Sequence, residues 1–186
     1  TGTASRVLPA DKGGWTVGVL VQANYGDRDQ LRVDGVPVGE SIDTDQVPSP
    51  WEVARSPLAP EYSRASPEGG SIIGIVATDA PLLPHQCERL AMRGALGLAR
   101  AGGYGSHSSG DMFVTFATGN RGLSTTAGEL AEGRLIADAR LVVDGAITPL
   151  LLATVEAVEE AIVNALVAAE TMTGRDGITA PPLPPA

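Results

Sequence analysis

The chain has 186 residues, of which 43% are hydrophobic and 19% charged, and its formal net charge is −9. This length suits one globular domain that buries roughly two thirds of its unfolded surface, and no apolar run approaches the ~20 residues of a membrane helix. Nucleic acids and anionic membranes require basic patches on a partner, so the acidic balance argues against both and favours a small neutral or cationic substrate.

The first structured block is followed by a linker. Polar and apolar residues alternate and then give way to an apolar run over Trp15 to Ala23, which predicts a largely buried strand. A polar turn at Asp27-Arg28-Asp29 comes next, and then a short strand with a turn at Asp34-Gly35. Residues 41–70 are read as a Pro-rich linker, because the stretch from Ser41 to Glu68 holds five prolines and many polar residues. We expect it to be exposed and poorly ordered; the alternative is an ordinary surface loop.

The second block alternates helices with apolar strands. In chain order we expect a strand at Ile72–Ala77, a helix from about His85 to Ala101 ended by Gly102-Gly103, a strand at Met112–Thr118, a short strand at Leu141–Val143 that pairs with it or with a neighbour, a helix from about Pro149 to Met172, and a disordered Pro-rich tail from Ala180. This alternation predicts a layered α/β domain.

Ser71 opens the predicted strand directly after Gly69 and Gly70. Glycine reaches torsion angles that other residues avoid, so the backbone can bend steeply at this junction. If the Gly70-Ser71 bond is cut, Ser71 gains a free α-amine, and an unperturbed pKa of about 7.7–8.0 lets this amine take the hydroxyl proton. The junction is therefore a candidate self-cleavage site and Ser71 a candidate N-terminal nucleophile. The alternative is a serine that simply starts a strand.

Two other segments bring polar side chains to strand ends. A Ser- and Gly-rich turn that contains Ser109 and Asp111 leads into the strand at Met112. Residues at the end of a strand are held rigidly while staying open to substrate. Asn24 closes the first strand, and its side-chain amide can donate to a developing oxyanion. The alternatives are a locally capped Ser/Gly turn and an asparagine with a turn role only.

Three motifs carry a family resemblance: Gly70 to Leu83, Ser108-Ser109-Gly110-Asp111, and Val19 to Gly26. Together they resemble the DmpA/BapA-type serine aminopeptidases, which are L-aminopeptidase/D-esterases and β-peptidyl aminopeptidases. The resemblance runs from Gly2 to about Ala169. It implies a four-layer αββα sandwich, similar to the ornithine acetyltransferase superfamily, and a precursor that cuts itself before Ser71 into α and β chains that stay together.

The resemblance also implies roles for single residues. Ser71 becomes the nucleophile, Ser109 hydrogen-bonds it, Asp111 orients it and balances the charge of its amine, and Asn24 binds the oxyanion. Asp111 is a departure, since some members have Glu at this position. Thr1-Gly2-Thr3-Ala4-Ser5-Arg6 matches an internal strand of the family.

The resemblance further implies an organisation for the whole protein. Residues 1–70 correspond to the C-terminal part of the α-chain region, with the linker 41–70, and residues 71–186 to the β-chain region, all within one αββα domain. The family has a long α region ahead of Thr1, so we expect a companion α segment, and a homo-oligomer that is a tetramer by resemblance.

Other candidates for chemistry are weaker. His107 stands two positions before Ser109 and suggests a triad, but this spacing alone does not aim both side chains at one substrate atom, so we expect a residue at the rim. His85 and Cys87 lack a second ligand pair, and no P-loop pattern accompanies Gly102 and Gly103, so we expect no metal and no cofactor. A free Thr1 is an alternative threonine-type nucleophile.

We therefore expect a self-processing aminopeptidase or amidase that cleaves short peptides or amides with a free N-terminus through an acyl-enzyme on Ser71. The alternatives are acyl transfer of the ornithine acetyltransferase type and a non-catalytic, uncut precursor or fragment. The single cysteine cannot form an internal disulfide, which leaves the redox compartment open. No basic and apolar leader begins at Thr1, and we expect a cytoplasmic protein, although a region ahead of Thr1 can hold a signal peptide.

Overall fold

The computed structural model describes residues 1–49, 70–123, 126–174 and 177–183. Its centre is a four-stranded sheet of order β1-β2-β3-β4. The strands are β1 (Gly2–Val7), β2 (Thr16–Asn24), β3 (Ser71–Thr78) and β4 (Met112–Ala117). β2 pairs antiparallel with both β1 and β3, whereas β3 and β4 are parallel. The parallel pair requires a crossover connection, and the helix α2 (Pro84–Arg100) supplies it.

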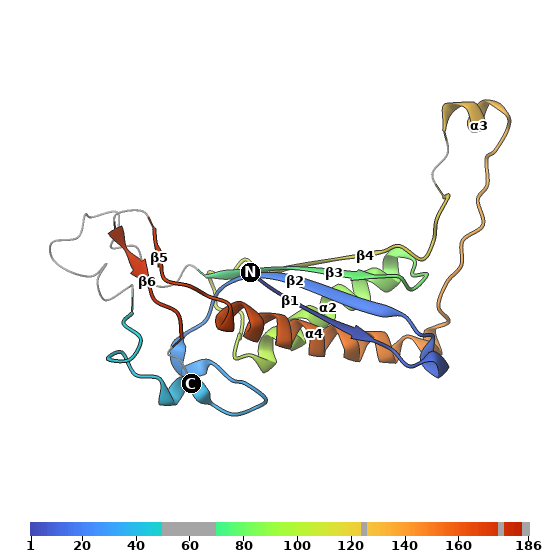
Figure 1. Ribbon diagram of the computed structural model, residues 1–186. Coiled ribbons are helices and arrows are strands. Elements are labelled where there is room, and N and C mark those ends of the chain that lie inside the picture. The colour runs from blue at the N-terminus through green and yellow to red at the C-terminus, as the bar shows by residue number, and fades with distance from the viewer. Residues whose placement is uncertain (50–69, 124–125, 175–176, 184–186) are drawn as a thin grey trace.

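Two helices cover one face of this sheet, as Figure 1 shows. α4 (Thr148–Val167) packs on β1, β2 and α2, while α2 contacts the sheet mainly at β4. Alternate strand residues point to this face and are buried with the helices. The buried core includes Val17, Val19, Val21, Ile72, Val76, Leu90, Leu98, Leu150, Val158 and Ile162. The described residues thus form one helical layer on one sheet layer.

Glycines let the helical layer approach the sheet closely. The ring of Phe113 lies between Gly74 of β3 and Gly94 of α2, and a Cβ added at either glycine would come 2.3 Å from that ring. Because interiors are close-packed, the aromatic ring fills the space that two missing side chains leave. This contact fixes α2 over the parallel pair β3 and β4.

The opposite face of the sheet is apolar and uncovered in the described residues. Its exposed side chains include Leu20, Ile73, Ile75, Met112, Val114 and Phe116. Contiguous apolar patches of this kind are uncommon on a monomer's free surface and mark an interaction site. β3 accordingly has apolar residues at almost every position, a pattern typical of strands that are buried on both faces.

An arm formed by residues 119–123 and 126–141 projects away from the sheet and carries the short helix α3 (Ala127–Ala131) at its tip (Figure 1). Asn120 joins the two legs of the arm by donating to the Arg140 carbonyl and accepting the Arg140 N–H, both at 2.8 Å. Near the tip, Arg134 pairs with Glu129 at 2.6 Å. Large apolar side chains on the arm are nevertheless exposed, notably Leu130, Leu135 and Ile136.

The structure differs from the sequence-based expectations in four segments. Around Asp34-Gly35 only an isolated bridge between Val33 and Val36 forms, because the turn returns the chain at once and neither leg lies beside the sheet. Leu141–Val143 is not a strand: the Val142 N–H donates to the Pro81 carbonyl, and the Val142 carbonyl accepts from Gln86.

The other two differences concern the C-terminal region. α4 ends at Val167, five positions before the expected end at Met172. Ala165 packs against Gly2, the first residue of β1, so the helix has passed the end of the sheet when it stops. The chain then forms a two-stranded ribbon of β5 (Met172–Thr173) and β6 (Thr179–Ala180) where a disordered tail was expected to begin. Residues 50–69 of the predicted linker and 184–186 of the tail lie outside the described residues.

Gln86 provides a test of this packing. It is completely buried, and its side-chain amide accepts the Leu83 N–H at 3.2 Å and donates to the Val142 carbonyl at 2.6 Å. Gln86→Leu leaves both backbone groups without this partner, so we expect the free energy of unfolding to fall by about 1–3 kcal/mol in urea denaturation. The exposed neighbour Glu88 gives the control, since Glu88→Leu should change stability by less than about 0.5 kcal/mol. Equal effects of the two changes would contradict the bridging role.

Within the described residues, no helix combines the length and the apolar character needed to cross a bilayer.

Candidate active site

Ser71 and Asn24 are direct partners across the antiparallel strands β3 and β2. Both occupy the strand positions that share a face with the exposed residues Leu20 and Ile73. Partners on one face of an antiparallel pair have Cβ atoms about 4.5–5.5 Å apart. The register therefore puts the Asn24 amide beside the Ser71 hydroxyl at one end of the sheet, on its uncovered face.

The loop before β4 reaches the same point. Because Ile73 of β3 pairs in parallel with Met112 of β4, the residues just ahead of Met112 lie beside the start of β3. The Gly110 N–H donates to Ser71 Oγ at 2.9 Å, and Asp111 Oδ1 accepts the Ile72 N–H at 3.0 Å. The structure thus brings Ser71, Asn24 and Asp111 together at one end of the sheet and adds Gly110.

Ser109 lies next to these contacts but uses its backbone differently. Its N–H closes the turn by donating to the Ser106 carbonyl at 2.9 Å. In the described part of the chain, the hydrogen bond to Ser71 Oγ comes from the Gly110 amide and none comes from the Ser109 hydroxyl. A hydrogen bond between Ser109 and Ser71 therefore stays a prediction. Sequence reasoning missed Gly110, because the donor is a backbone group that every non-proline residue carries.

Gly70, on the other side of the candidate scissile bond, packs against the end of β2. A Cβ at this position would come 2.6 Å from the Asn24 carbonyl oxygen and 2.8 Å from Tyr25 Cα. Both neighbours are backbone atoms, which cannot move aside as a flexible side chain can. The absence of a side chain thus allows the junction to lie directly against Asn24.

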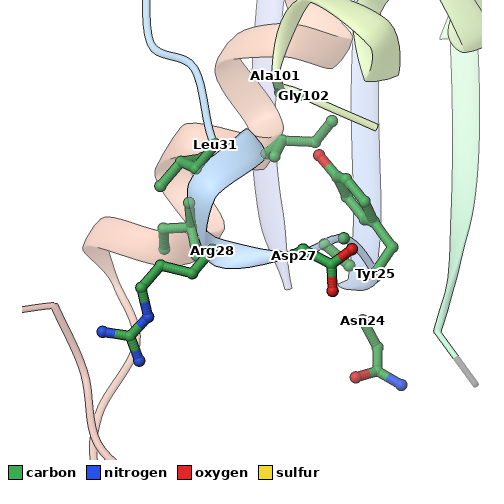
Figure 2. Close-up of a pocket in the computed structure, with 11 residues that line it drawn as sticks. Asn24, Tyr25, Asp27, Arg28, Leu31, Ala101 and Gly102 are labelled. Atoms are coloured by element: carbon green, nitrogen blue, oxygen red, sulfur yellow. The ribbon is translucent and has the colours of Figure 1, made fainter. Parts of the chain in front are cut away.

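Figure 2 shows the cavity beside this end of β2. Its volume is about 310 Å³, and its lining includes Asn24, Tyr25, Asp27, Leu31 and Ile162. Ser71 is not among the lining residues, and the buried Ile162 of α4 places the cavity toward the helical layer.

Tyr25 connects the cavity with the candidate site. Burial raises the pKa of the Tyr25 phenol well above its usual value, and the nearby charge of Asp111 raises it further. The phenol therefore stays protonated through the neutral range and presents a neutral side chain to the cavity that it lines.

Arg28 orders the loop that follows the cavity and leads toward the linker. In Figure 2 its side chain points away from Asn24 and Tyr25. Its guanidinium donates to the backbone carbonyls of Ile42, Asp43 and Val47, at 2.7 Å for Asp43. Arg28 is therefore occupied in holding the loop.

The remaining candidates from the sequence lie away from Ser71 or lack the neighbouring side chains that catalysis or metal binding would need. His107 is exposed on the loop before β4, and His85 is exposed in the first turn of α2. Cys87 is half-buried on α2, and burial raises the pKa of its thiol. Thr1 precedes β1, and β2 lies between β1 and the strand β3 that carries Ser71. The described residues contain no group of three His, Cys, Asp or Glu side chains that could hold a metal ion.

Comparison with known proteins decides the family. The model of peptidase family S58 matches residues 1–180. The chain belongs to peptidase family S58. Among the relatives of this S58 chain is the β-peptidyl aminopeptidase BapA of Sphingosinicella microcystinivorans, which is 44% identical over 184 residues. That alignment covers 99% of the S58 chain and 44% of the relative.

Solved structures agree with this assignment. A Burkholderia sp. β-aminopeptidase has 50% identity and a TM-score of 0.80, with 97% of this chain and 45% of that chain covered. An L-aminopeptidase D-Ala-esterase/amidase from Ochrobactrum anthropi has 37% identity and a TM-score of 0.74, with 98% and 44% covered. The latter is described as a prototype for the serine aminopeptidases and a new variant among the Ntn hydrolase fold.

These matches confirm both the predicted DmpA/BapA-type family and the α/β fold class of the αββα type. The described residues of the S58 chain supply one sheet layer and one helical layer of that fold. The chain spans less than half the length of the relatives it matches, 44% of BapA and 45% of the Burkholderia enzyme.

Proposed function

We propose that this chain carries the nucleophile of a self-processing aminopeptidase that cleaves short peptides or amides with a free N-terminus. One observation carries the proposal: in a chain of peptidase family S58, Ser71 Oγ accepts a 2.9 Å hydrogen bond from Gly110, directly opposite Asn24. Named relatives that are aminopeptidases favour hydrolysis over acyl transfer. The processing cut separates residues 1–70, the C-terminal part of the α-chain region, from residues 71–186, which belong to the β-chain region.

Processing begins with the uncut chain. Ser71 Oγ attacks the Gly70 carbonyl carbon and gives up its proton, and the Gly70-Ser71 C–N bond breaks as the Ser71 nitrogen takes a proton. This forms an ester between the Gly70 acyl group and Ser71 Oγ. Water then hydrolyses the ester, leaving a Gly70 carboxylate and a Ser71 residue with a free amine and a free hydroxyl.

The same oxygen serves the peptidase reaction. The Ser71 amine takes the hydroxyl proton while Oγ attacks the substrate carbonyl, and the Asn24 side-chain amide donates to the oxyanion. The amine then passes the proton to the leaving nitrogen, and water hydrolyses the acyl-enzyme. Asp111 stands close enough to Ser71 to favour the protonated amine that forms between these steps.

A companion α segment is part of the proposal. The uncovered sheet face presents apolar side chains from three strands, among them Leu20, Ile75 and Phe116. A second sheet from the companion segment, packed on this face about 10 Å away, would bury them and complete four layers. The relatives are more than twice as long as this chain, which provides the length for such a segment.

We also propose a homo-oligomer, a tetramer by resemblance, and a cytoplasmic location. The projecting arm supports the first, since it carries the exposed apolar side chains Leu135 and Ile136, and exposed apolar surface of this kind marks an interaction site. The free thiol of Cys87 is compatible with a reducing compartment. Sedimentation velocity tests the oligomer, and cell fractionation tests the location.

A pH–rate profile on paired substrates tests the proposed activity. Activity on an amino-acid p-nitroanilide is expected to rise with pH through the pKa of the Ser71 amine, because only the neutral amine accepts the hydroxyl proton. The N-acetyl analogue should be a poor substrate, because an aminopeptidase must bind a free amine. Equal hydrolysis of both substrates would contradict the aminopeptidase but leave an amidase in place. If protein cut at Ser71 hydrolyses neither substrate, the hydrolase proposal is wrong.

A further inference from the structure

Two consecutive residues hold β3 at two consecutive positions. The Gly110 N–H donates to Ser71 Oγ at 2.9 Å, and the Asp111 carboxylate accepts the Ile72 N–H at 3.0 Å. Both distances lie in the range of well-formed hydrogen bonds. Neither contact involves the nitrogen of Ser71, so the cut at Gly70-Ser71 does not create them and they can serve both reactions.

The Gly110 contact has a direct chemical consequence. Because Ser71 Oγ accepts this bond, its own proton remains available to a base. As that proton leaves, negative charge develops on Oγ, and a hydrogen bond to an ionised acceptor is shorter and roughly twice as strong as one between neutral groups. The backbone donor is thus worth more in the transition state than in the resting enzyme, which is the condition for a contribution to the rate.

The Asp111 contact has a different consequence. Ile72 is completely buried, so the backbone just after Ser71 is anchored in the core, and the carboxylate fixes its N–H from the loop side. A shift of about 1 Å in a reacting group can lower a rate about 100-fold. Holding Ile72 therefore holds the nucleophile in register with Asn24.

We propose that Gly110 and Asp111 act as a clamp on the nucleophile, in which the Gly110 backbone amide is a catalytic donor to Ser71 Oγ and Asp111 is a positioning residue through Ile72. This role of Asp111 is separate from its charge. The proposal rests on the proposed function, since it requires Ser71 to be the nucleophile. A Cβ at residue 110 would lie 3.4 Å from Ser71 Oγ, at ordinary van der Waals contact, which shows how closely the loop approaches the nucleophile.

An amide-to-ester change tests the Gly110 donor. Glycolic acid in place of Gly110, introduced through a chemically acylated suppressor tRNA, replaces the N–H by an oxygen and adds no side chain. We expect the rates of self-cleavage and of p-nitroanilide acylation both to fall about 10²-fold, as for the loss of one oxyanion donor. The same replacement at Gly122, an exposed residue of the arm, is the matched control and should leave both rates unchanged.

Two variants separate the positioning role of Asp111 from its charge. Asp111→Asn keeps an oxygen that can accept the Ile72 N–H but removes the charge, whereas Asp111→Ala removes both. We expect Asp111→Asn to process and to hydrolyse about ten-fold faster than Asp111→Ala, with the difference in kcat and not in KM. Equal rates for the two variants would show that Asp111 acts through charge alone and would overturn the positioning role.

The outcomes also separate the clamp from the proposed function. If the wild-type protein neither cuts at Ser71 nor hydrolyses a peptide amide, the proposed function is wrong. If the wild type does both while the ester at position 110 changes each rate by less than about two-fold, the proposed function stands and the Gly110 donor is overturned.

Discussion

Ser71→Ala is expected to leave one uncut chain across Gly70-Ser71 and to reduce turnover by roughly 10⁴-fold or more. Alanine cannot attack the Gly70 carbonyl, so no new N-terminus forms, and the acyl-enzyme has no oxygen on which to form. Intact-mass measurement and N-terminal sequencing report the cut, and p-nitroanilide release reports turnover. The effect on both readouts should be larger than for any other single substitution considered.

A matched serine variant controls for this result. Ser41 is exposed at the end of the short helical turn η3 (Val38–Ser41), away from the strand ends that form the site, so Ser41→Ala should process and turn over normally. The wild-type protein should contain a polypeptide that begins at Ser71. A fully active enzyme with no such N-terminus would remove Ser71 as an N-terminal nucleophile.

Local patterns in the sequence predict the elements that carry the site. The apolar run after Gly70 predicts a strand at Ile72–Ala77, and β3 extends it by one residue at each end. The helix predicted from His85 to Ala101 forms from Pro84 to Arg100, since its apolar residues recur at helical spacing and Gly102 follows. These signals are local, because each depends only on residues that are close together in the sequence.

The geometry of the site depends on pairings that no local signal contains. The register of Asn24 with Ser71 follows from how β2 and β3 align over their whole lengths. The position of Gly110 follows from the parallel register of β4 with β3, which α2 and its loops determine. The sequence marked Ser71, Asn24 and Asp111 only through their places at strand ends and through resemblance, and it contained no signal for the Gly110 amide.

Asn24→Ala is expected to lower kcat for peptide amides by about 10²–10³-fold while KM changes little. The amide is the register partner of Ser71 on the same face of the sheet, so it lies where the carbonyl oxygen of an attacked substrate gains charge. A donor aimed at that charge acts mainly in the transition state, which is why the loss appears in kcat. Cleavage before Ser71 should slow as well, because it passes through a tetrahedral intermediate at the Gly70 carbonyl.

Gln22 makes this experiment specific. It carries the same amide group on the same face of β2, but two residues earlier and opposite Ile73. Gln22→Ala should therefore leave steady-state turnover and processing close to wild type, although it removes a similar amount of polar surface. If Asn24→Ala behaves like Gln22→Ala, Asn24 only ends the strand before the turn at Tyr25-Gly26, and the oxyanion must be bound by backbone N–H groups alone.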